Sequence, residues 1–321
     1  MQRTGNGDPL HIGFMVKWQP HDRAVVEQTC PPTMICHFLD EDLSKNTETL
    51  RLVDVLVVGT QAVSSSLITA APRLGLIQRW GTGFDNIDLV YAKRRGITVA
   101  ELPGFNARSV SEFIICAILA LFRHLPEVTA AWADGRWLGG DLRAPAQRLE
   151  GKTVGLLGFG AIGQDVARLL AGFSVRIIYH DCADVDHESP KVRSVTKEEL
   201  LRASDVICVQ LPLTEATRGA ITEAEIALMK PSATVISVSR AGVVDEGAVR
   251  AAVRAKRLFA ASFDNFEVEP LPRDAIRSEP RILATPHMAG ATVEGFEALV
   301  RACFESIALA HEGAIASTQT G

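Results

Sequence analysis

Three reactive side chains follow apolar runs of the sequence, at points where a buried strand would end. Arg240 follows the run VISVS, Glu269 comes shortly after AASF, and His287 follows LATP. A guanidinium can bind a carboxylate through two hydrogen bonds and polarise an adjacent carbonyl. An imidazole can donate a proton to a forming alkoxide, and a carboxylate can orient and charge that imidazole. Together these groups suit the reduction of a 2-oxo acid by a hydride donor.

Each of the three residues also has a purely structural interpretation. A histidine after a proline is often a turn residue, and Arg240 could pair with Asp245 at the surface. Glu269, which precedes Pro270, could belong to a solvated loop. Because the carboxyl ends of parallel strands lie at one edge of a sheet, the shared position after strands favours a functional role for all three.

A glycine-rich turn offers a place for the hydride donor. The stretch 151–181 reads as strand, turn, helix and second strand, with G-x-G-x-x-G at the turn. The glycines are Gly158, which permits the turn, Gly160, which lets the backbone approach a pyrophosphate, and Gly163, which lets helix and strand pack closely. The helix would present free N–H groups and its positive dipole end to phosphates.

An acidic residue at the end of the second strand favours NAD over NADP. Asp181 stands roughly 20 residues after the glycines, where a carboxylate can accept hydrogen bonds from ribose hydroxyls. It would repel the additional phosphate of NADP. His180 and Cys182 flank it, and no Arg or Lys stands beside it to bind a 2′-phosphate. An α/β turn without a ligand is the alternative, but the agreement of strand, helix, second strand and terminal acid disfavours it. We therefore predict NAD as the cofactor.

Apolar runs alternate with helical or polar segments along the chain, which indicates a parallel α/β architecture in 321 residues, enough for two domains. The predicted strands before the glycine-rich turn are 11–18, 34–39, 53–59, 74–78 and 97–101. Six further strands fit a doubly wound sheet, at 153–157, 175–179, 206–211, 233–238, 258–263 and 282–284. Helices are predicted over 110–124, 223–230, 245–256 and 292–312.

Composition excludes several classes of partner. A net charge of −5 argues against nucleic acid and anionic membranes, and the longest apolar run, 113–122, is too short to span a bilayer. The six cysteines lack C-x-x-C spacing, which predicts a reducing cytoplasmic location and no metal site. They are Cys30, Cys36, Cys116, Cys182, Cys208 and Cys303.

Two segments remain open at this level. The loop at Gly81 and Gly83 could receive an anion on its backbone N–H groups, or could be a plain turn. The helix over 110–124 is apolar nearly all round, so it must be buried in its domain or against a second subunit. Trp132 and Trp137 follow it in an irregular arm that we interpret as interface or lid material.

The chain resembles the D-isomer-specific 2-hydroxyacid dehydrogenases over nearly its whole length. Six motifs in family order carry the resemblance: GTGFDNID, LEGKTVGLLGFGAIG, LPLTEAT, SRAGVVDE, FDNFEVEP and TPHMAGAT. The resemblance assigns the catalytic roles to Arg240, Glu269 and His287, in agreement with the chemistry above. It implies substrate binding by Thr82, Gly83, Arg240 and His287. Its cofactor contacts fall on Ala161 and Ile162 at the phosphates, Asp181 at the ribose, Pro212 and Thr217 beside the cofactor, Val238 and Ser239 through backbone, and Asp264 at the nicotinamide.

The resemblance also implies the architecture. We expect an α/β fold of two Rossmann-like domains, with a doubly wound parallel-sheet NAD domain inserted into a smaller flavodoxin-like substrate domain. On this basis residues 104–287 form the NAD-binding domain, and residues 1–103 with 288–321 form the discontinuous substrate domain. The family architecture further implies closure of the cleft over the cofactor and a homodimer formed through residues 110–137.

The sequence departs from the family pattern in three places. Ser237 stands where Asn is common, and Ala241 where Gly usually follows the catalytic Arg. A Cβ at position 241 could shift the Arg240 loop, which would affect rate and substrate fit more than reaction class. Residues 61–63 lack the arginines with which similar phosphoglycerate dehydrogenases bind phosphate, so a phosphorylated substrate is disfavoured.

Two classes of function compete. The first is an NAD-dependent enzyme that interconverts a small 2-oxo acid, such as glyoxylate, hydroxypyruvate or pyruvate, and its D-2-hydroxy acid, with His287 as acid and base. The second is an NAD(H)-sensing binding protein like the corepressors that share this fold. Formate and phosphite dehydrogenases are similar enzymes, but formate dehydrogenases carry Gln where Glu269 stands, which counts against that reading.

Overall fold

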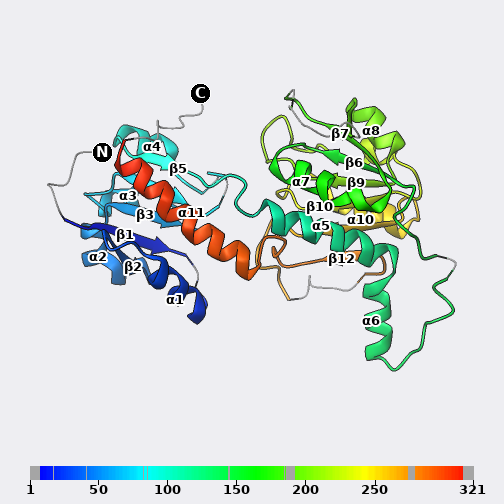
Figure 1. The fold of residues 1–321 in the computed structure, drawn as a ribbon, viewed down its shortest axis with the longest axis horizontal. Helices are drawn as coiled ribbons and strands as arrows, with labels where there is room; N and C mark the ends of the chain where they lie inside the picture. The colour runs from blue at the N-terminus through cyan, green and yellow to red at the C-terminus, as the bar shows by residue number, and fades with distance from the viewer. Residues whose placement is uncertain are drawn as a thin grey trace. The chain divides into compact units, whose positions relative to one another are not determined.

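Two compact units make up the chain (Figure 1). The computed structural model describes residues 8–16, 18–40, 42–81, 83–84, 86–143, 145–183, 185, 192–273 and 279–313. Unit 1 consists of Met1–Asn106 and Thr292–Gly321, and unit 2 consists of Ala107–Ala291. The chain therefore leaves unit 1 once and returns to it once.

Unit 1 is built on a five-stranded parallel sheet in the order β2-β1-β3-β4-β5. The strands are β1 (Leu10–Met15), β2 (Met34–Phe38), β3 (Val55–Val58), β4 (Leu76–Arg79) and β5 (Thr98–Ala100). Every residue of β3 is buried, as expected for the centre of a parallel sheet covered on both faces. The helices are α1 (Pro20–Thr29), α2 (Thr47–Leu52), α3 (Ser65–Ala70), α4 (Leu89–Arg94) and the long C-terminal α11 (Val293–His311), preceded at α2 by the 3-10 turn Leu43–Asn46.

The C-terminal helix completes the core of unit 1. Val300, Cys303 and Ile307 of α11 pack in one buried cluster with Ile12 and Phe14 of β1. Figure 1 shows α11 lying along this sheet. The helix thus covers a face that residues of the first third of the chain leave apolar, so the last segment of the sequence belongs physically to the first domain.

Unit 2 is built on a seven-stranded parallel sheet in the order β12-β11-β10-β9-β6-β7-β8. The strands are β6 (Thr153–Leu157), β7 (Arg176–His180), β8 (Val192–Ser194), β9 (Val206–Val209), β10 (Thr234–Ser237), β11 (Ala260–Phe263) and β12 (Ile282–Ala284). The order reverses between β6 and β9. In open α/β sheets, ligands bind beside the carboxyl ends of the strands at such a switch point.

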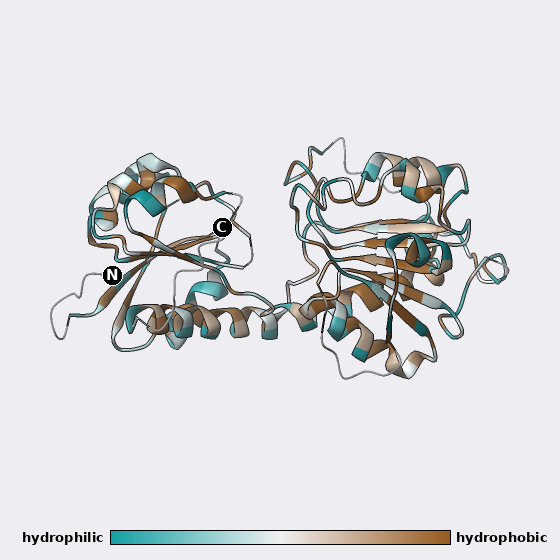
Figure 2. Cartoon of the chain, turned by 90° about the horizontal axis from the view of Figure 1, so that it is seen from above, coloured by the Kyte–Doolittle hydropathy of each residue, from teal (hydrophilic) through white to brown (hydrophobic). Residues whose placement is uncertain are grey.

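Helices cover both faces of this second sheet. They are α5 (Ala107–Phe122), α6 (Leu125–Ala133), α7 (Ala161–Leu170), α8 (Lys197–Ala203), α9 (Glu223–Ile226) and α10 (Glu246–Arg254), with the 3-10 turn Ala171–Phe173 after α7. Alternate strand residues face the two cores: Cys208 of β9 packs with α5 and α7, whereas Ile207 and Val209 pack with α8 and α10. Figure 2 shows the hydrophobic colour concentrated on the strands and on the helix faces that meet them.

The structure differs from the sequence prediction at two elements of unit 2. The sheet has seven strands rather than six, because β8 has only three residues and shows no periodic pattern to recognise. The arm after α5 is not irregular throughout: α6 begins with Pro126 in its first turn, directly after His124 at φ +56°. A left-handed residue ends the first helix, and a proline starts the second. Trp132 lies within α6, and Trp137 follows it.

No single helix within the described ranges is both long and apolar enough to cross a bilayer, and only α5 and α6 taken together, with a bend of 65° between them, meet those criteria.

Candidate functional site

The glycine-rich turn joins β6 to α7, and two of its glycines have no room for a side chain. Gly158 has φ +97°, a conformation that residues with a Cβ rarely adopt. A Cβ on Gly163 would lie 2.6 Å from the carbonyl oxygen of Gly158, so the helix could not pack this close to the strand end. Gln210, at the end of β9, secures the turn by donating from Nε2 to that same oxygen at 2.7 Å.

The remaining glycine of the motif, Gly160, lies in an open part of the turn. Gly160 is exposed, and a Cβ built on it would meet no described atom within 4 Å. It is the N-cap of α7, and no side chain of the described residues caps that helix. The N-terminus of α7, at Gly160, Ala161 and Ile162, thus has an uncapped N-cap and open space beside Gly160, and this fits a pyrophosphate at a helix N-terminus.

Asp181 lies directly after β7 and beside this turn. Its Oδ2 accepts a hydrogen bond from the backbone N–H of Phe159 at 2.6 Å, and its Oδ1 accepts one from Ala183 at 3.0 Å. Burial by itself raises the pKa of the Asp181 carboxyl, but the hydrogen bonds from Ala183, Phe159 and Cys182 outweigh it and lower the pKa below its usual value. The carboxylate is therefore ionised at neutral pH, which fits ribose hydroxyls and opposes a 2′-phosphate.

Four further residues predicted to contact the cofactor follow the ends of β9 and β10. The hydroxyl of Thr217 donates to the carbonyl oxygen of Pro212 at 2.5 Å, and that of Ser239 donates to the carbonyl oxygen of Val209 at 2.9 Å. Val238 and Ser239 directly follow β10 and are buried. Since β10, β9 and β6 are adjacent and parallel, these residues share the sheet edge with the glycine-rich turn.

His287 and Glu269 meet at the same edge. Their side chains follow β12 and β11, and the imidazole Nδ1 lies 2.7 Å from the carboxylate Oε2. The other carboxylate oxygen, Oε1, accepts the backbone N–H of Phe266 at 2.9 Å, which fixes the orientation of the carboxylate. An ionised carboxylate can only accept, so Nδ1 carries the shared hydrogen and Nε2 points to other partners. The side chains remain 45% and 33% exposed, so a reactant can reach the imidazole.

A buried carboxylate holds the turn that carries His287. Asp264, 2% exposed, accepts the Thr285 hydroxyl on Oδ1 at 2.6 Å. The same oxygen accepts the N–H of Met288 at 2.9 Å, and Oδ2 accepts that of Ala289 at 2.9 Å. These hydrogen bonds restrain the chain on both sides of His287, whose φ is +52°. We predicted Asp264 only as a nicotinamide contact, because no sequence signal reveals that a residue after β11 binds the turn after β12.

Arg240 follows β10, between the turn at Gly158 and the imidazole in strand order. Its Nη1 lies 3.5 Å from the carbonyl oxygen of Ser239. Ser237, where the family commonly has Asn, is buried, and its carbonyl oxygen accepts the N–H of Asp264. Arg240, Glu269 and His287 thus share one edge of one sheet, as the sequence pattern indicated.

The predicted carboxylate-binding loop lies in unit 1. Thr82 is outside the described residues. Gly83, with φ +89°, donates its N–H to Oε2 of Glu101 at 2.9 Å, and Arg79 donates to the Gly83 carbonyl oxygen at 2.9 Å. Sequence reasoning missed Glu101, whose place directly after β5 is the same kind of strand-end signal that identified Arg240. In this structure the loop N–H serves an internal carboxylate.

In the described ranges, no three His, Cys, Asp or Glu side chains are grouped so that they could hold a metal ion. The site consists of the N-terminus of α7, which suits a phosphate, the ionised carboxylate of Asp181, and the imidazole–carboxylate pair of His287 and Glu269. All lie along one edge of the sheet. Such a set can bind a dinucleotide and transfer protons.

Comparison with known proteins gives a consistent result. Residues 115–289 match the family model of the D-isomer specific 2-hydroxyacid dehydrogenase NAD binding domain. The chain is 40% identical over 247 residues to hydroxypyruvate reductase of Thermotoga maritima, which covers 75% of this chain and 79% of that protein. It is 37% identical over 269 residues to glyoxylate reductase of Aeropyrum pernix, covering 78% and 77%. A crystal structure of a Polaromonas protein, described as a D-isomer specific 2-hydroxyacid dehydrogenase, superposes with a TM-score of 0.84 at 26% identity, covering 96% and 98%.

Proposed function

The chain belongs to the D-isomer-specific 2-hydroxyacid dehydrogenase family, and we propose from its site that it reduces small 2-oxo acids to D-2-hydroxy acids with NADH. It is an NAD-dependent oxidoreductase that interconverts 2-oxo and 2-hydroxy acids. The observation that carries the proposal is the pairing of His287 with Glu269 at the sheet edge that also bears the glycine-rich turn.

The residues of unit 2 supply binding and proton transfer. The cofactor supplies the hydride when bound, and Gly158, Gly160, Gly163 and the N-terminus of α7 would hold its pyrophosphate, with Asp181 at the ribose. His287 Nε2 donates a proton to the substrate oxygen that gains negative charge, and takes it back in the reverse direction. Glu269 keeps Nδ1–H in place and stabilises the positive charge on the imidazole while it holds two protons.

Substrate binding is assigned to charged and backbone groups. The guanidinium of Arg240 can bind the substrate carboxylate in a bidentate manner. The loop at Thr82 and Gly83 is proposed to contribute backbone ligands to the substrate. We propose that unit 2 holds the cofactor and supplies Arg240 and His287, and that unit 1 supplies the Thr82 and Gly83 loop, close to the expected division at residues 103/104 and 287/288. Glyoxylate, hydroxypyruvate and pyruvate are the proposed substrates. Residues 61–63, without arginine, disfavour a phosphorylated acid.

The test is the loss of NADH absorbance in the presence of a panel of 2-oxo acids. Turnover with at least one unphosphorylated acid, giving the D-product on a chiral column, supports the proposal. NADH binding without turnover of any acid would instead favour the NAD(H)-sensing alternative. Turnover of formate or phosphite in the oxidative direction, with inactivity toward 2-oxo acids, would point to the third reading.

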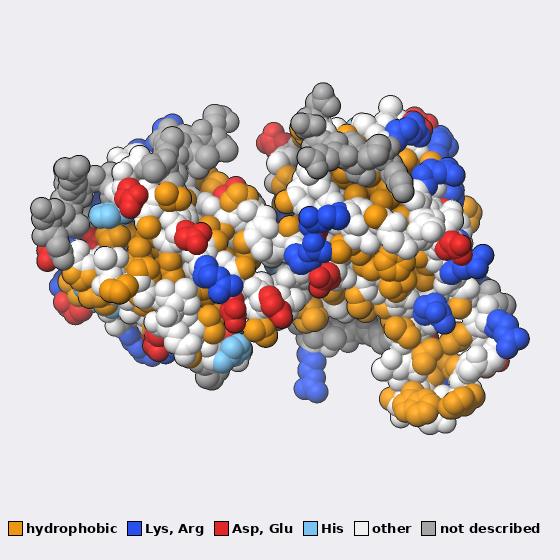
Figure 3. All heavy atoms as spheres, viewed as in Figure 1, with side chains coloured by type: hydrophobic (Ala, Val, Ile, Leu, Met, Phe, Trp, Pro, Cys, Tyr) orange, Lys and Arg blue, Asp and Glu red, His pale blue; other side chains and the backbone are white. Residues whose placement is uncertain are grey.

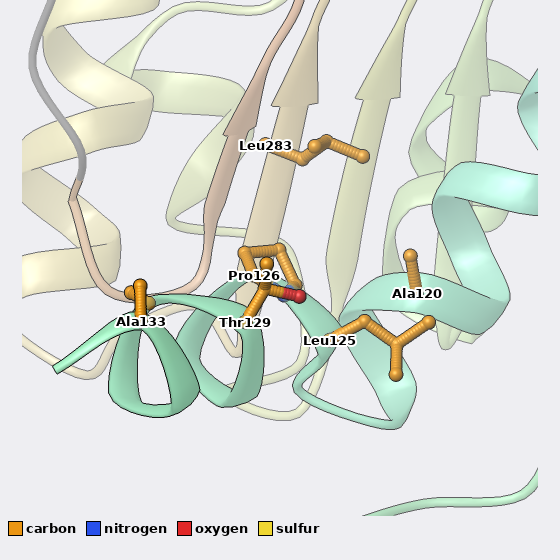
Figure 4. Close-up of a pocket in the computed structure, with 7 residues that line it drawn as sticks. Ala120, Leu125, Pro126, Thr129, Ala133 and Leu283 are labelled. Atoms are coloured by element: carbon orange, nitrogen blue, oxygen red, sulfur yellow. The ribbon is translucent and has the colours of Figure 1, made fainter. Parts of the chain in front are cut away.

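We also propose a homodimer, for which α5 and α6 supply the surface. An apolar groove on unit 2 is lined by Ala120, Leu125, Pro126, Thr129, Ala130, Ala133 and Leu283 (Figure 4). Beyond it, Trp132 and Trp137 are 67% and 79% exposed and contact each other, with ring centroids 5.8 Å apart. Figure 3 shows hydrophobic side chains gathered at the end of the α6 projection. Exposed tryptophans next to an apolar groove are typical of an interface.

Light scattering on the purified chain tests the oligomer. We expect about twice the chain mass of 34.6 kDa for the wild type and a shift toward the monomer for Trp132→Glu. Glu198→Gln, at an exposed charged position of α8 outside the proposed surface, is the control and should stay dimeric. A monomeric wild type at micromolar concentration would contradict the dimer without touching the redox assignment. A cytoplasmic location is proposed as well, since the six cysteines are scattered along the sequence without C-x-x-C spacing.

A further inference from the structure

Two cysteines of unit 1 lie in sulfur–sulfur contact. Cys30 caps the C-terminus of α1, Cys36 lies in β2, and the distance between the two Sγ atoms is 3.0 Å. Neither cysteine is in a disulfide, and both are partly exposed to solvent. A disulfide needs about 2.0 Å between the sulfurs, so a movement of about 1 Å would bring them to bonding distance.

The contact is held by regular structure on both sides. The backbone N–H of Cys30 bonds to the carbonyl oxygen of Val26, and Cys36 is paired in the sheet with Ile12. The Cys30 Sγ also lies 3.4 Å from the carbonyl oxygen of Met34. Because the end of a helix and a strand hold the two cysteines, the contact between their sulfurs follows from the positions of these two elements.

The other four cysteines do not share this arrangement. Cys116 and Cys182 are exposed, and Cys208 and Cys303 are buried. Within the part of the chain that the structure describes, no other two cysteine sulfurs lie within hydrogen-bonding distance of each other. The chain therefore contains one vicinal pair among six thiols, and that pair can be tested by chemistry that single thiols cannot perform.

We propose that Cys30 and Cys36 form a reversible redox site that closes to an intramolecular disulfide in the presence of a hydroperoxide. In the first step the Cys30 sulfur attacks one peroxide oxygen and the O–O bond breaks. Cys30 becomes a sulfenic acid, and the other peroxide oxygen takes up the thiol proton and leaves as water or an alcohol. In the second step the Cys36 sulfur attacks the sulfenic sulfur, the S–O bond breaks, and water leaves with the Cys36 proton. Two thiols are oxidised and one peroxide is reduced. An added dithiol then reduces the disulfide by exchange and is itself oxidised.

The environment decides the order of the steps. Burial and the contact with Cys30 raise the pKa of the Cys36 thiol, which keeps it protonated and slow as a first nucleophile. Cys30 is therefore the attacking residue and Cys36 the resolving one. Closure ties the end of α1 to β2, the edge strand of the five-stranded sheet, so the oxidised chain should unfold at a higher temperature than the reduced one.

The sequence makes the cross-link simple to map. Both cysteines lie on the tryptic peptide 24–45, and Met34 lies between them, so cyanogen bromide cuts the chain inside the proposed loop. The experiment uses the full chain carrying Cys116→Ser and Cys182→Ser, which removes the two exposed thiols. The protein is treated with hydrogen peroxide, its remaining thiols are alkylated under denaturing conditions, and the peptides are weighed.

We expect peptide 24–45 without alkyl groups, about 2 Da lighter than the reduced peptide, and still joined after cleavage at Met34. Dithiothreitol should restore two alkylation sites. In the additional variant Cys36→Ser, Cys30 should progress to sulfinic acid instead. Alkylation of both cysteines after peroxide, oxidation of Cys30 without a cross-link in the Cys36 protein, or a bond from Cys36 to Cys303 would each overturn the proposal. The readout does not use NADH turnover, so it is independent of the proposed function.

Discussion

The imidazole Nδ1 of His287 lies 2.7 Å from the carboxylate Oε2 of Glu269, although the two residues are 18 positions apart in the sequence. This contact fixes which ring nitrogen carries the hydrogen and leaves Nε2 for the reactant. A backbone N–H on the second oxygen of Glu269 and a buried Asp264 behind the turn complete the support. His287, the proposed proton donor, is thus held both at its ring and at its backbone.

Replacing His287 should separate chemistry from cofactor binding. We expect His287→Ala to lower kcat by about 10²–10⁴-fold, because a positioned general acid contributes that much, while the NADH dissociation constant stays nearly unchanged. Steady-state kinetics and NADH fluorescence titration measure the two quantities. His21→Ala, at an exposed histidine of α1, is the control and should behave as wild type. A normal kcat for His287→Ala would remove the imidazole from the mechanism.

Replacing Asp264 should displace the imidazole of His287, because Asp264 holds the turn that carries it. Asparagine has the same size, but its NH₂ group would face a donor where the carboxylate accepts the N–H of Met288 or Ala289. We expect kcat to fall about tenfold or more and the protein to lose about 1–3 kcal/mol of stability, the cost of a buried unpaired donor. Asp245→Asn, which affects only the cap of α10 at Ala248, should leave kcat intact. Equal kcat values for both variants would argue that the turn at His287 does not depend on this carboxylate.

Replacing Asp181 should weaken the discrimination between the two cofactors. Two like charges a few ångströms apart repel by about 1 kcal/mol even in water, so Asp181→Ser should raise the ratio of kcat/KM for NADPH to that for NADH about fivefold or more. The kinetic assay with both cofactors measures it, and Asp134→Ser, at an exposed position after α6, serves for comparison. An unaltered ratio contradicts the role of Asp181 at the ribose.

Replacing Glu101 should release a backbone donor. The Gly83 N–H that we assign to the substrate donates to Glu101 in this structure. Glu101→Ala removes the competing carboxylate, and one exchanged hydrogen bond is worth about 1 kcal/mol, so KM for the 2-oxo acid should fall about fivefold at similar kcat. Glu112→Ala in α5 should show no change. A higher KM in Glu101→Ala would mean that Glu101 shapes the loop for the substrate and does not compete with it.

Acid stability should depend on Glu225. Burial raises the pKa of the Glu225 carboxyl, but the hydrogen bonds from Thr222 and Lys197 outweigh this effect and lower the pKa from 4.5 to about 2. Because the folded pKa lies below the unfolded one, the stabilisation is fully present above pH 4.5 and is lost as the pH falls toward 2. Denaturant unfolding at several pH values should show Glu225→Gln less stable than wild type at neutral pH, with the gap closing across that window.

The control for this measurement is Glu223→Gln. Glu223 lies on the same short helix, but its side chain is 78% exposed and faces Arg257 at 3.5 Å. Its difference from wild type should be small and nearly independent of pH. A constant gap for Glu225→Gln from neutral pH to pH 2 would show that the carboxylate contributes through packing rather than through its charge.

The sequence by itself determined the parallel α/β fold, the glycine-rich turn between β6 and α7, and the family. These features are local: apolar runs, glycines at a fixed spacing and an acid after the second strand can be recognised within about thirty residues. It also predicted that Arg240, Glu269 and His287 follow strands, and from parallel strands a shared edge follows directly. The sequence did not predict β8, because three residues are too few to show a period. It did not predict α6 either, because α5 ends before His124 and a second helix, with Pro126 in its first turn, begins directly after it.

Only the tertiary structure decided which of these groups touch. The grip of Asp264 on the His287 turn depends on β11 lying beside β12, and the contact of Gly83 with Glu101 depends on β4 lying beside β5. The sulfur contact of Cys30 with Cys36 likewise requires the end of α1 to lie against β2. Strand order and side-chain direction across neighbouring elements arise from the packing of the whole core, so no pattern along a single segment can specify them.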